Sequence, residues 1–371
     1  MSVLNCAVDS QTTCEIKRVE LRDCISTSRT SGLPRNPELQ EISITQYRPG
    51  LSSIIGLRPS YSLLLSTSDS SKNPLFRGAC IYVRQRTPDE LWITSDLLAT
   101  RTSQQSVILI SKVQLLRDDS GSVSSVRWLK LRPPPNMPMP AGGSHYRDGM
   151  LFCSQGSQSR GTGGLYYMPR NEPPEPVATS YFGRDFNSVQ DVVVSSDGSL
   201  WFTDSCDGFD NDFRPEPQLP CHVYRYDPTT GDLRVMADNL GRPHGIALSP
   251  DQSIVYLSDM TPLRATDSAA QDSLSRGAIY AFDIVLRCGS PFLANKRVFA
   301  YALTGRPMGI MCDESGNVYA GCSGGVEIWN PGGSVQGVIE VPGGVTSLSP
   351  GREGELFLCS GQRLWRMQFT F

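Results

Sequence analysis

The chain contains three histidines, His145, His222 and His244, and these are its first candidates for proton transfer. An imidazole with an ordinary pKa of about 6.5 can act as an acid or a base near neutral pH. A Gly-x-Ser-x-Gly match occurs at residues 321–325, but it lies within a strand-like run, and no helix pattern follows it as a nucleophile elbow requires. The sequence has no Cys-x-x-Cys pair among its eleven cysteines, which argues against a zinc site. These patterns favour acid/base chemistry over nucleophilic or zinc-dependent chemistry.

The composition limits the classes of partner. The chain has 371 residues with 34 Lys and Arg against 37 Asp and Glu, a net charge of −3. A nearly balanced charge argues against nucleic acid as the main partner, because phosphate binding requires a basic surface. No apolar run approaches the roughly 18 residues of a membrane span. The N-terminal sequence lacks the basic and apolar segments of a secretion signal, so we expect a cytoplasmic protein that binds small molecules.

Five of the eleven cysteines lie in apolar, strand-like runs, and we expect those to be buried free thiols. They are Cys80, Cys153, Cys312, Cys322 and Cys359. Cys6, Cys14 and Cys24 lie near the N-terminus, where two of them would pair if the compartment were oxidising.

One pattern recurs along the chain: a short apolar run, a turn containing Asp, Gly, Ser or Pro, and a second run ending in a small polar residue. The copies begin near residues 79, 147, 191, 245, 309 and 344, and each is typical of a β-hairpin. Six such units without a long helix predict an all-β fold, a six-bladed β-propeller with a central channel. We expect residues 1–44 to form an N-terminal arm and residues 45–371 the propeller.

Two segments depart from this pattern. Residues 132–141 are rich in proline and are not expected to form a central strand. Residues 261–276 are polar and are expected to form a long surface loop. Residues 1–75 match the repeats poorly, and we expect them to supply closing outer strands.

In a propeller, the residue just before each repeat faces the top of the channel, which is the default binding site. His145 precedes the second repeat, together with Tyr146, and Asp191 begins the third. Aspartates at similar places in other copies, Asp204 and Asp259, indicate a role in locking the blades. Asp191 stays a candidate for binding because it follows Gln190.

The sequence resembles the fungal branch of the gluconolactonase, senescence-marker-protein and luciferin-regenerating-enzyme family. The resemblance spans about residues 45–371 and rests on several motifs in order: SHYRDGMLFCSQG from 144, FNSVQDVVVSSDGSLWFTD from 186, GRPHGIALSPD from 241 and GRPMGIMCDESGNVYAG from 305. The resemblance implies a six-bladed propeller that holds a divalent cation in its channel. It also implies an enzyme that hydrolyses lactones or related esters.

The family holds its metal with one Glu, two Asn and one Asp, and the matching positions here are all changed. They carry Gly78, Gln190, His244 and Met308. Calcium and magnesium require hard oxygen ligands, preferably carboxylates, and this set offers none. We therefore expect no metal and no other cofactor, and a neutral channel that receives apolar small molecules.

The loss of these ligands suggests a further resemblance, to the hetero-Diels–Alderases of tropolonic sesquiterpene biosynthesis. Such an enzyme would join a tropolone ortho-quinone methide to a humulene-type olefin. On this hypothesis His244 is the proton donor with Gln190 as its partner, and substrate contacts come from Gly78, Met308, His145, Tyr146 and Asp191. Two alternatives stay open: a metal-dependent lactonase or esterase that uses other ligands, and a binding propeller without catalytic activity.

Overall fold

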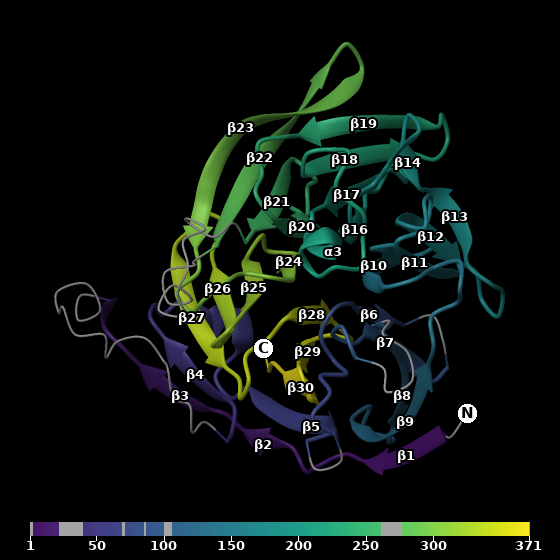
Figure 1. The fold of residues 1–371 in the computed structure, drawn as a ribbon. Helices are drawn as coiled ribbons and strands as arrows, with labels where there is room; N and C mark the ends of the chain where they lie inside the picture. Colours follow the sequence, from purple (N-terminus) through teal and green to yellow (C-terminus); the bar gives the residue numbers. More distant parts are fainter. Residues whose placement is uncertain are drawn as a thin grey trace, which may run out of the picture.

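The propeller is seen directly in a computed structural model, which describes residues 3–21, 40–68, 71–84, 87–99, 106–260 and 277–370. Within these ranges, six sheets of four to six strands surround a common axis (Figure 1). The expected all-β, six-bladed propeller is confirmed. Among the described residues, no helix is both long enough and apolar enough to span a membrane. The loop expected at 261–276, and Cys24, lie outside the described ranges.

Blades 1 to 4 are built from consecutive strands, numbered from the channel outwards. Blade 1 contains β6 (Cys80–Val83), β7 (Asp89–Thr94), β8 (Ile110–Arg117) and β9 (Val123–Leu131), with β1 (Val3–Ala7) outside β9. Blade 2 contains β10 (Pro140–Tyr146), β11 (Gly149–Ser154), β12 (Gly164–Met168) and β13 (Glu175–Ala178). The short pair β14 (Ser180–Tyr181) and β15 (Arg184–Asp185) follows it.

Blade 3 contains β16 (Val189–Val194), β17 (Leu200–Asp204), β18 (His222–Asp227) and β19 (Asp232–Ala237), with α3 (Asp207–Asp210) between β17 and β18. Blade 4 contains β20 (Pro243–Leu248), β21 (Ile254–Asp259), β22 (Ala278–Arg287) and β23 (Ser290–Tyr301).

Blades 5 and 6 combine strands from both ends of the chain, and this closes the ring. Blade 5 contains β24 (Ile310–Cys312), β25 (Val318–Cys322), β26 (Gly325–Trp329) and β27 (Val335–Glu340), completed by β4 (Ser43–Gln46) and β3 (Glu15–Arg18). Blade 6 contains β28 (Ser347–Pro350), β29 (Glu355–Ser360) and β30 (Arg363–Gln368), completed by β5 (Ser60–Ser66) and β2 (Thr12–Thr13). Helix α2 (Leu51–Ile55) lies between β4 and β5. The segment before residue 75 thus supplies outer strands, as expected. The predicted boundary between residues 44 and 45 stays a prediction, and β4 spans it.

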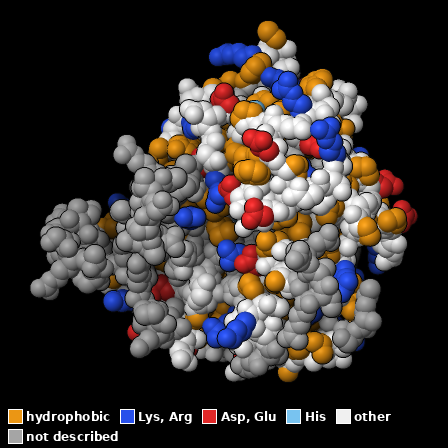
Figure 2. Space-filling model, viewed as in Figure 1, with side chains coloured by type: hydrophobic (Ala, Val, Ile, Leu, Met, Phe, Trp, Pro, Cys, Tyr) orange, Lys and Arg blue, Asp and Glu red, His pale blue; other side chains and the backbone are white. Residues whose placement is uncertain are grey.

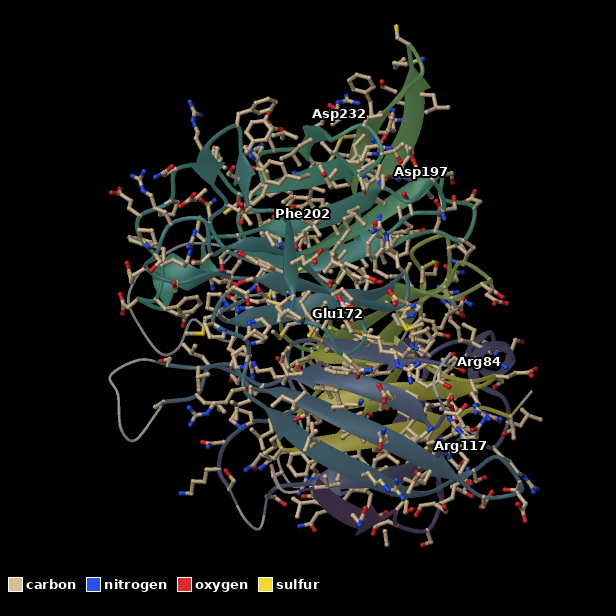
Figure 3. The ribbon with its side chains drawn as sticks, turned by 90° about the vertical axis from the view of Figure 1, so that its right-hand side faces the viewer. Arg84, Arg117, Glu172, Asp197, Phe202 and Asp232 are labelled. Atoms are coloured by element: carbon tan, nitrogen blue, oxygen red, sulfur yellow. The ribbon has the colours of Figure 1, made fainter. Side chains whose placement is uncertain are left out.

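The apolar core is divided into six clusters, and each lies between two neighbouring blades. Phe202, for example, stacks on Tyr224 with ring centroids 5.3 Å apart, inside the cluster between blades 2 and 3 (Figure 3). Because a middle strand packs against a blade on either side, both of its faces are apolar. Every residue of β11 and of β29 is buried. This arrangement leaves the axis of the ring unfilled and available as a channel.

The second repeat begins earlier than the sequence pattern indicated. Residue 147 lies in the turn after β10, and the innermost strand β10 starts at Pro140, inside the segment where no central strand was expected. The innermost strand is an edge of its sheet, and proline is tolerated as the first residue of an edge strand because it need not donate to the ladder.

A buried ion-pair network joins blade 6 to blade 1. The Arg117 guanidinium, on β8, lies 3.0 Å from the Asp89 carboxylate and 2.7 Å from that of Glu355 on β29 (Figure 3). Arg366 contacts Glu355 at 2.7 Å, and Arg352 contacts Asp89 at 2.8 Å. Burial alone would raise the pKa of Glu355, but hydrogen bonds and charge from Arg117 and Arg366 hold it below its usual value. The carboxylates of Asp89 and Glu355 are therefore ionised. The positive charge of the neighbouring arginines compensates the cost of burying each of them.

We predict that Arg117→Met destabilises the propeller by about 3 kcal/mol, because it leaves buried carboxylates under-compensated. Urea unfolding followed by circular dichroism measures this. The matched control is Arg297→Met, whose partner Asp283 is 34% exposed and which should cost less than about 1 kcal/mol. Equal losses in the two variants would contradict a special role for the network at the blade 6–blade 1 junction.

Candidate functional site

The channel forms a cavity of about 1790 Å³ between the six inner strands. Gly78, Gln190, His244 and Met308 all line it, and they come from blades 1, 3, 4 and 5. The face that carries α3 shows acidic and basic side chains close together around its centre (Figure 2). We call this end of the channel the mouth. The expected convergence of the four positions on one cavity is thus observed.

Three inner strands have a bulge at the mouth, and this sets the direction of their side chains. The pairing register shifts between Pro140 and Gly143 in β10, between Val189 and Val192 in β16, and between Pro243 and Ile246 in β20. A bulge leaves residues without a cross-strand partner and re-aims their side chains. Gln190 and His244 occupy equivalent places within two of these bulges, which explains why both reach the channel.

Hydroxyl groups from the blades hold the inner strands in place around the mouth. Thr94 donates to the Ala141 carbonyl at 2.8 Å, and Thr203 donates to the His244 carbonyl at 2.6 Å. Two further bonds of this kind run from Ser258 to the Met308 carbonyl and from Thr346 to the Arg77 carbonyl, both at 2.7 Å. Each bond joins one blade to the next, so the positions that line the mouth are fixed relative to one another.

The Gln190 amide is held in a buried polar network. Its Nε2 atom donates to Gln155 Oε1 at 3.1 Å, and lies 3.2 Å from the Ser205 hydroxyl and 3.3 Å from the Ser188 hydroxyl. Gln155 Oε1 also accepts from Ser188 at 3.1 Å. The amide nitrogen is therefore already satisfied by protein groups. The main role of the Gln190 side chain is therefore structural: it determines the shape and polarity of the channel wall.

Asp191 places a carboxyl group between three inner strands. Its oxygens accept from the backbone N–H of Val192 at 2.9 Å and of Ile246 at 3.2 Å. A side chain on Gly142 would come within 2.6 Å of the carboxylate, so the glycine makes room for it. Burial raises the pKa of Asp191 to about 7, despite the two N–H donors that lower it. Near neutral pH the group can therefore hold or release a proton.

His244 is the titratable imidazole of the mouth. Burial lowers its pKa below 6.5, an effect that Asp207 opposes and that Arg77 reinforces. Its Nδ1 atom is buried and has no hydrogen-bond partner within the described residues. Asp207 itself is paired with Arg242 at 2.9 Å. The neutral imidazole therefore predominates at pH 7, which suits a proton acceptor better than the imidazolium donor expected from the sequence.

The other histidines and Tyr146 lie elsewhere. His145 lines the channel, but it is near the end of β10 opposite the mouth, on the side of the molecule where Figure 3 shows Arg84. Tyr146 is buried in the cluster between blades 2 and 3 and does not line the cavity among the described residues, because its ring packs edge-on against Tyr167. This differs from the substrate contact expected of it. His222 lies outside the channel, with Nδ1 3.1 Å from the Tyr224 hydroxyl.

The residues at the four family positions do not fit a hard divalent cation. Gly78 has no side chain, Met308 supplies a thioether, and the Gln190 amide nitrogen is turned into the network described above. The nearest carboxylate in sequence, Asp191, is held by backbone N–H groups. Within the described ranges, no three His, Cys, Asp or Glu side chains are grouped so as to hold a metal ion.

Several residues of the mouth were not identified from the sequence. Gln155, Ser188 and Ser205 complete the Gln190 network, and Arg242 with Asp207 flanks His244. Ser205 ends a repeat with a small polar residue, which was a visible signal without an assigned role. By contrast, Asp204 and Asp259 have structural roles: each accepts backbone N–H donors from the segment that leads into the inner strand of its own blade. Asp204 accepts two N–H donors, from Asn187 at 3.0 Å and Ser188 at 2.7 Å.

Comparison with known proteins shows the family to which the chain belongs. The model of the SMP-30/gluconolactonase/LRE-like region matches residues 134–362, more than half of the chain. Lactonohydrolase oryH of Aspergillus oryzae is 27% identical over 76% of this chain and 70% of its own length. Lactonohydrolase oryL of the same fungus is 28% identical over 51% of this chain, and the gluconolactonase of Zymomonas mobilis is 33% identical over 44%. The chain spans about half the length of these last two relatives, 47% and 44%.

Solved structures share the fold. The gluconolactonase XC5397 of Xanthomonas campestris superimposes with a TM-score of 0.67 over 90% of this chain and 96% of its own, at 21% identity. A putative gluconolactonase structure gives a TM-score of 0.62 over 88% of this chain, at 19% identity. At these identities the likeness concerns the fold alone.

We predict that Asp191→Asn changes how stability depends on pH. The folded-state pKa of about 7 lies above the ordinary value of 3.8, so the folded protein retains a proton that the unfolded chain releases. This contribution is complete below about pH 4 and is lost as the pH rises through about 7. Urea unfolding from pH 4 to pH 8 should therefore show the wild type losing stability relative to Asp191→Asn, by at most about 4 kcal/mol.

The control for this experiment is Asp232→Asn, at an exposed aspartate on β19 (Figure 3). Its difference from the wild type should not vary with pH. If the difference in stability between Asp191→Asn and the wild type is also independent of pH, burial does not raise the pKa of Asp191 in the folded protein.

Proposed function

Because the chain belongs to the SMP-30/gluconolactonase/LRE-like family, we propose that it is a hydrolase that opens a lactone or related cyclic ester in the channel. The observation that carries this proposal is the position of His244. A buried imidazole with a lowered pKa lies at the mouth of the channel, in a place the family uses for a metal ligand. The curated relatives named above are lactonohydrolases and a gluconolactonase, which supports hydrolysis as the reaction.

In the proposed reaction, neutral His244 takes a proton from a water molecule as its oxygen attacks the lactone carbonyl. The carbonyl oxygen becomes negative, and Arg77 and Arg242, which line the same mouth, supply positive charge nearby. The carbon–oxygen bond of the ring then breaks, and the imidazolium returns its proton to the departing oxygen. Water and lactone are thus converted to a hydroxy acid, and His244 ends in its starting form.

The site also indicates the kind of substrate. The two buried titratable groups of the mouth, His244 and Asp191, are both shifted towards their neutral forms. Arg77 and Arg242 are paired with Asp96 and Asp207. A mouth with compensated charges favours a neutral organic molecule over a polyanion. At about 1790 Å³ the cavity exceeds the roughly 300–1,000 Å³ of common ligand pockets, so it has room for a large substrate.

We predict that His244→Gln lowers the kcat of lactone hydrolysis by roughly 10²–10⁴-fold, because general-base assistance is lost. A pH-stat assay of purified protein with a panel of neutral aliphatic and aromatic lactones measures it. In the wild type, kcat/KM should rise with pH to a plateau, with the inflection below the ordinary histidine pKa of about 6.5. The matched control is His222→Gln, which removes a half-buried histidine outside the channel and should leave the rate unchanged.

The same assay distinguishes the metal-dependent alternative. We expect activity to survive treatment with a chelator, because the four mouth positions do not suit a hard cation. Loss of activity in chelator and its recovery with calcium would contradict this expectation and point to ligands elsewhere. Turnover of no lactone in the panel would count against the hydrolase itself.

A second candidate is the hetero-Diels–Alder reaction, and a specific observation favours it. Gly78, Gln190 and Met308 line a channel of a size that suits two reactants. In this reaction a hydroxymethyl tropolone loses water to give an ortho-quinone methide, which then adds a humulene-type olefin to close a dihydropyran ring. Binding and orientation of two neutral molecules can lower the barrier by about 7–11 kcal/mol at the limit.

This candidate is tested with a tropolone quinone-methide precursor and humulenol. If the adduct yield and diastereomer ratio with protein match those without it, the chain is not a cycloaddition catalyst. A raised yield of one diastereomer, together with no hydrolysis of any lactone, would replace the hydrolase proposal with this one.

A further inference from the structure

Two cysteines lie in contact at the base of a loop beside the channel mouth. Cys206 follows β17, Cys221 precedes β18, and their Sγ atoms are 3.3 Å apart. Both thiols are free and half-buried, so small reagents can reach them. The four cysteines Cys14, Cys153, Cys322 and Cys359 are, by contrast, buried in the apolar clusters.

The segment between the two cysteines, residues 207–220, forms part of the wall of the mouth, and we call it the mouth loop. Asp207, Asn211 and Phe213 line the cavity. The loop begins next to the Gln190 network, because the Ser205 hydroxyl accepts from the Asp207 N–H at 3.3 Å and lies 3.2 Å from Gln190 Nε2. The position of the base of the loop therefore affects the site itself.

The rest of the loop is held to blade 3 by hydrogen bonds to the segment just before β16. Arg214 Nε donates to the Asn187 carbonyl, and Asn187 Nδ2 donates to the Leu219 carbonyl, both at 2.8 Å. Strands β17 and β18 pair as far as Asp204 and His222. Beyond this last pair, within the described residues, the thiol contact is the remaining side-chain link between the two ends of the loop.

We propose that Cys206 and Cys221 form a reversible disulfide on reaction with an oxidised low-molecular-weight thiol such as glutathione disulfide, and that this bond fixes the base of the mouth loop. The Cys206 thiolate attacks one sulfur of the oxidant and releases one reduced thiol. The Cys221 sulfur then attacks the mixed disulfide at Cys206 and releases the second. Two protein thiols are oxidised, one external disulfide is reduced to two thiols, and the two thiol protons pass to those products.

The environment of the pair supports this order of attack. A hydrogen bond from the Cys221 thiol lowers the pKa of Cys206 and raises that of Cys221. The thiolate is the nucleophile in thiol–disulfide exchange, so Cys206 reacts first and Cys221 resolves the mixed disulfide. The proposal does not rest on the identity of the reaction in the channel.

The test uses the full chain with Cys288→Ser, which removes the exposed cysteine at the turn between β22 and β23. The protein is incubated with glutathione disulfide, the remaining thiols are alkylated, and peptides are analysed by mass spectrometry without reduction. We expect a cross-linked peptide containing Cys206 and Cys221, a mass loss of about 2 Da for two hydrogens, and full reversal by dithiothreitol. Alkylation of both cysteines after this incubation would overturn the proposal.

Two single variants test the order of attack. Cys221→Ser should accumulate a glutathione adduct on Cys206, because no thiol is left to displace it. Cys206→Ser should gain an adduct at Cys221 much more slowly. Equal rates of adduct formation in the two variants would contradict the assignment of Cys206 as the attacking thiol.

Hydrogen exchange tests the effect on the loop. Oxidation should slow amide exchange over residues 207–220, and exchange in blades 5 and 6 should not change. The double variant Cys206→Ser/Cys221→Ser, with folding checked by circular dichroism, should show no response to the oxidant. Unchanged exchange in an oxidised, cross-linked protein would overturn the claim that the bond fixes the mouth loop.

Discussion

The antiparallel pairing of β5 with β30 is the interaction on which the rest of the structure depends. It joins Ser60–Ser66, near the N-terminus, to Arg363–Gln368 at the C-terminus, and it completes blade 6. Blade 5 is completed in the same way by β4. Each of the six apolar clusters needs a blade on both sides, so an open ring would expose the clusters next to the gap. Closure therefore stabilises every interface between blades.

The charged network at the junction of blades 6 and 1 adds specificity to this closure. Apolar packing is tolerant of small shifts, whereas the Arg117 guanidinium contacts Asp89 and Glu355 at fixed distances. The hydroxyl–carbonyl bonds between blades then hold the backbone of His244 and Met308 in place beside the axis. The geometry of the channel is in this sense a consequence of the ring.

The electrostatics of the mouth follow from burial in this channel. Burial disfavours the charged forms of both acids and bases. It therefore lowers the pKa of the His244 imidazole and raises the pKa of the Asp191 carboxyl. The family fold is retained, and Gly78, Gln190, His244 and Met308 line its channel at the positions where the resemblance implies metal ligands. Fold and chemistry can separate in this way because the propeller is stabilised between its blades, and the residues at its axis contribute little to that packing.

The sequence by itself determined the fold class, because apolar alternation and repeated turn signals reflect local strand preferences and burial. It also identified residues at the starts of the inner strands, since Gln190, His244 and Met308 stand in corresponding places of repeated units. The expectation that each precedes its strand is wrong for two of them, because Gln190 and His244 are the second residues of β16 and β20. It misplaced the second repeat, where the glycines and prolines before residue 147 obscured β10.

Only the tertiary structure decided what these residues do. Tyr146 is next to His145 in sequence, but strand alternation sends its ring between two blades and away from the channel. The Gln190 network joins groups from blades 2 and 3, and the Cys206–Cys221 contact depends on how β17 pairs with β18. The state of His244 depends on burial and on charges from blades 1, 3 and 4. Such contacts arise between segments far apart in the chain, and local sequence patterns contain no information about the distances between them.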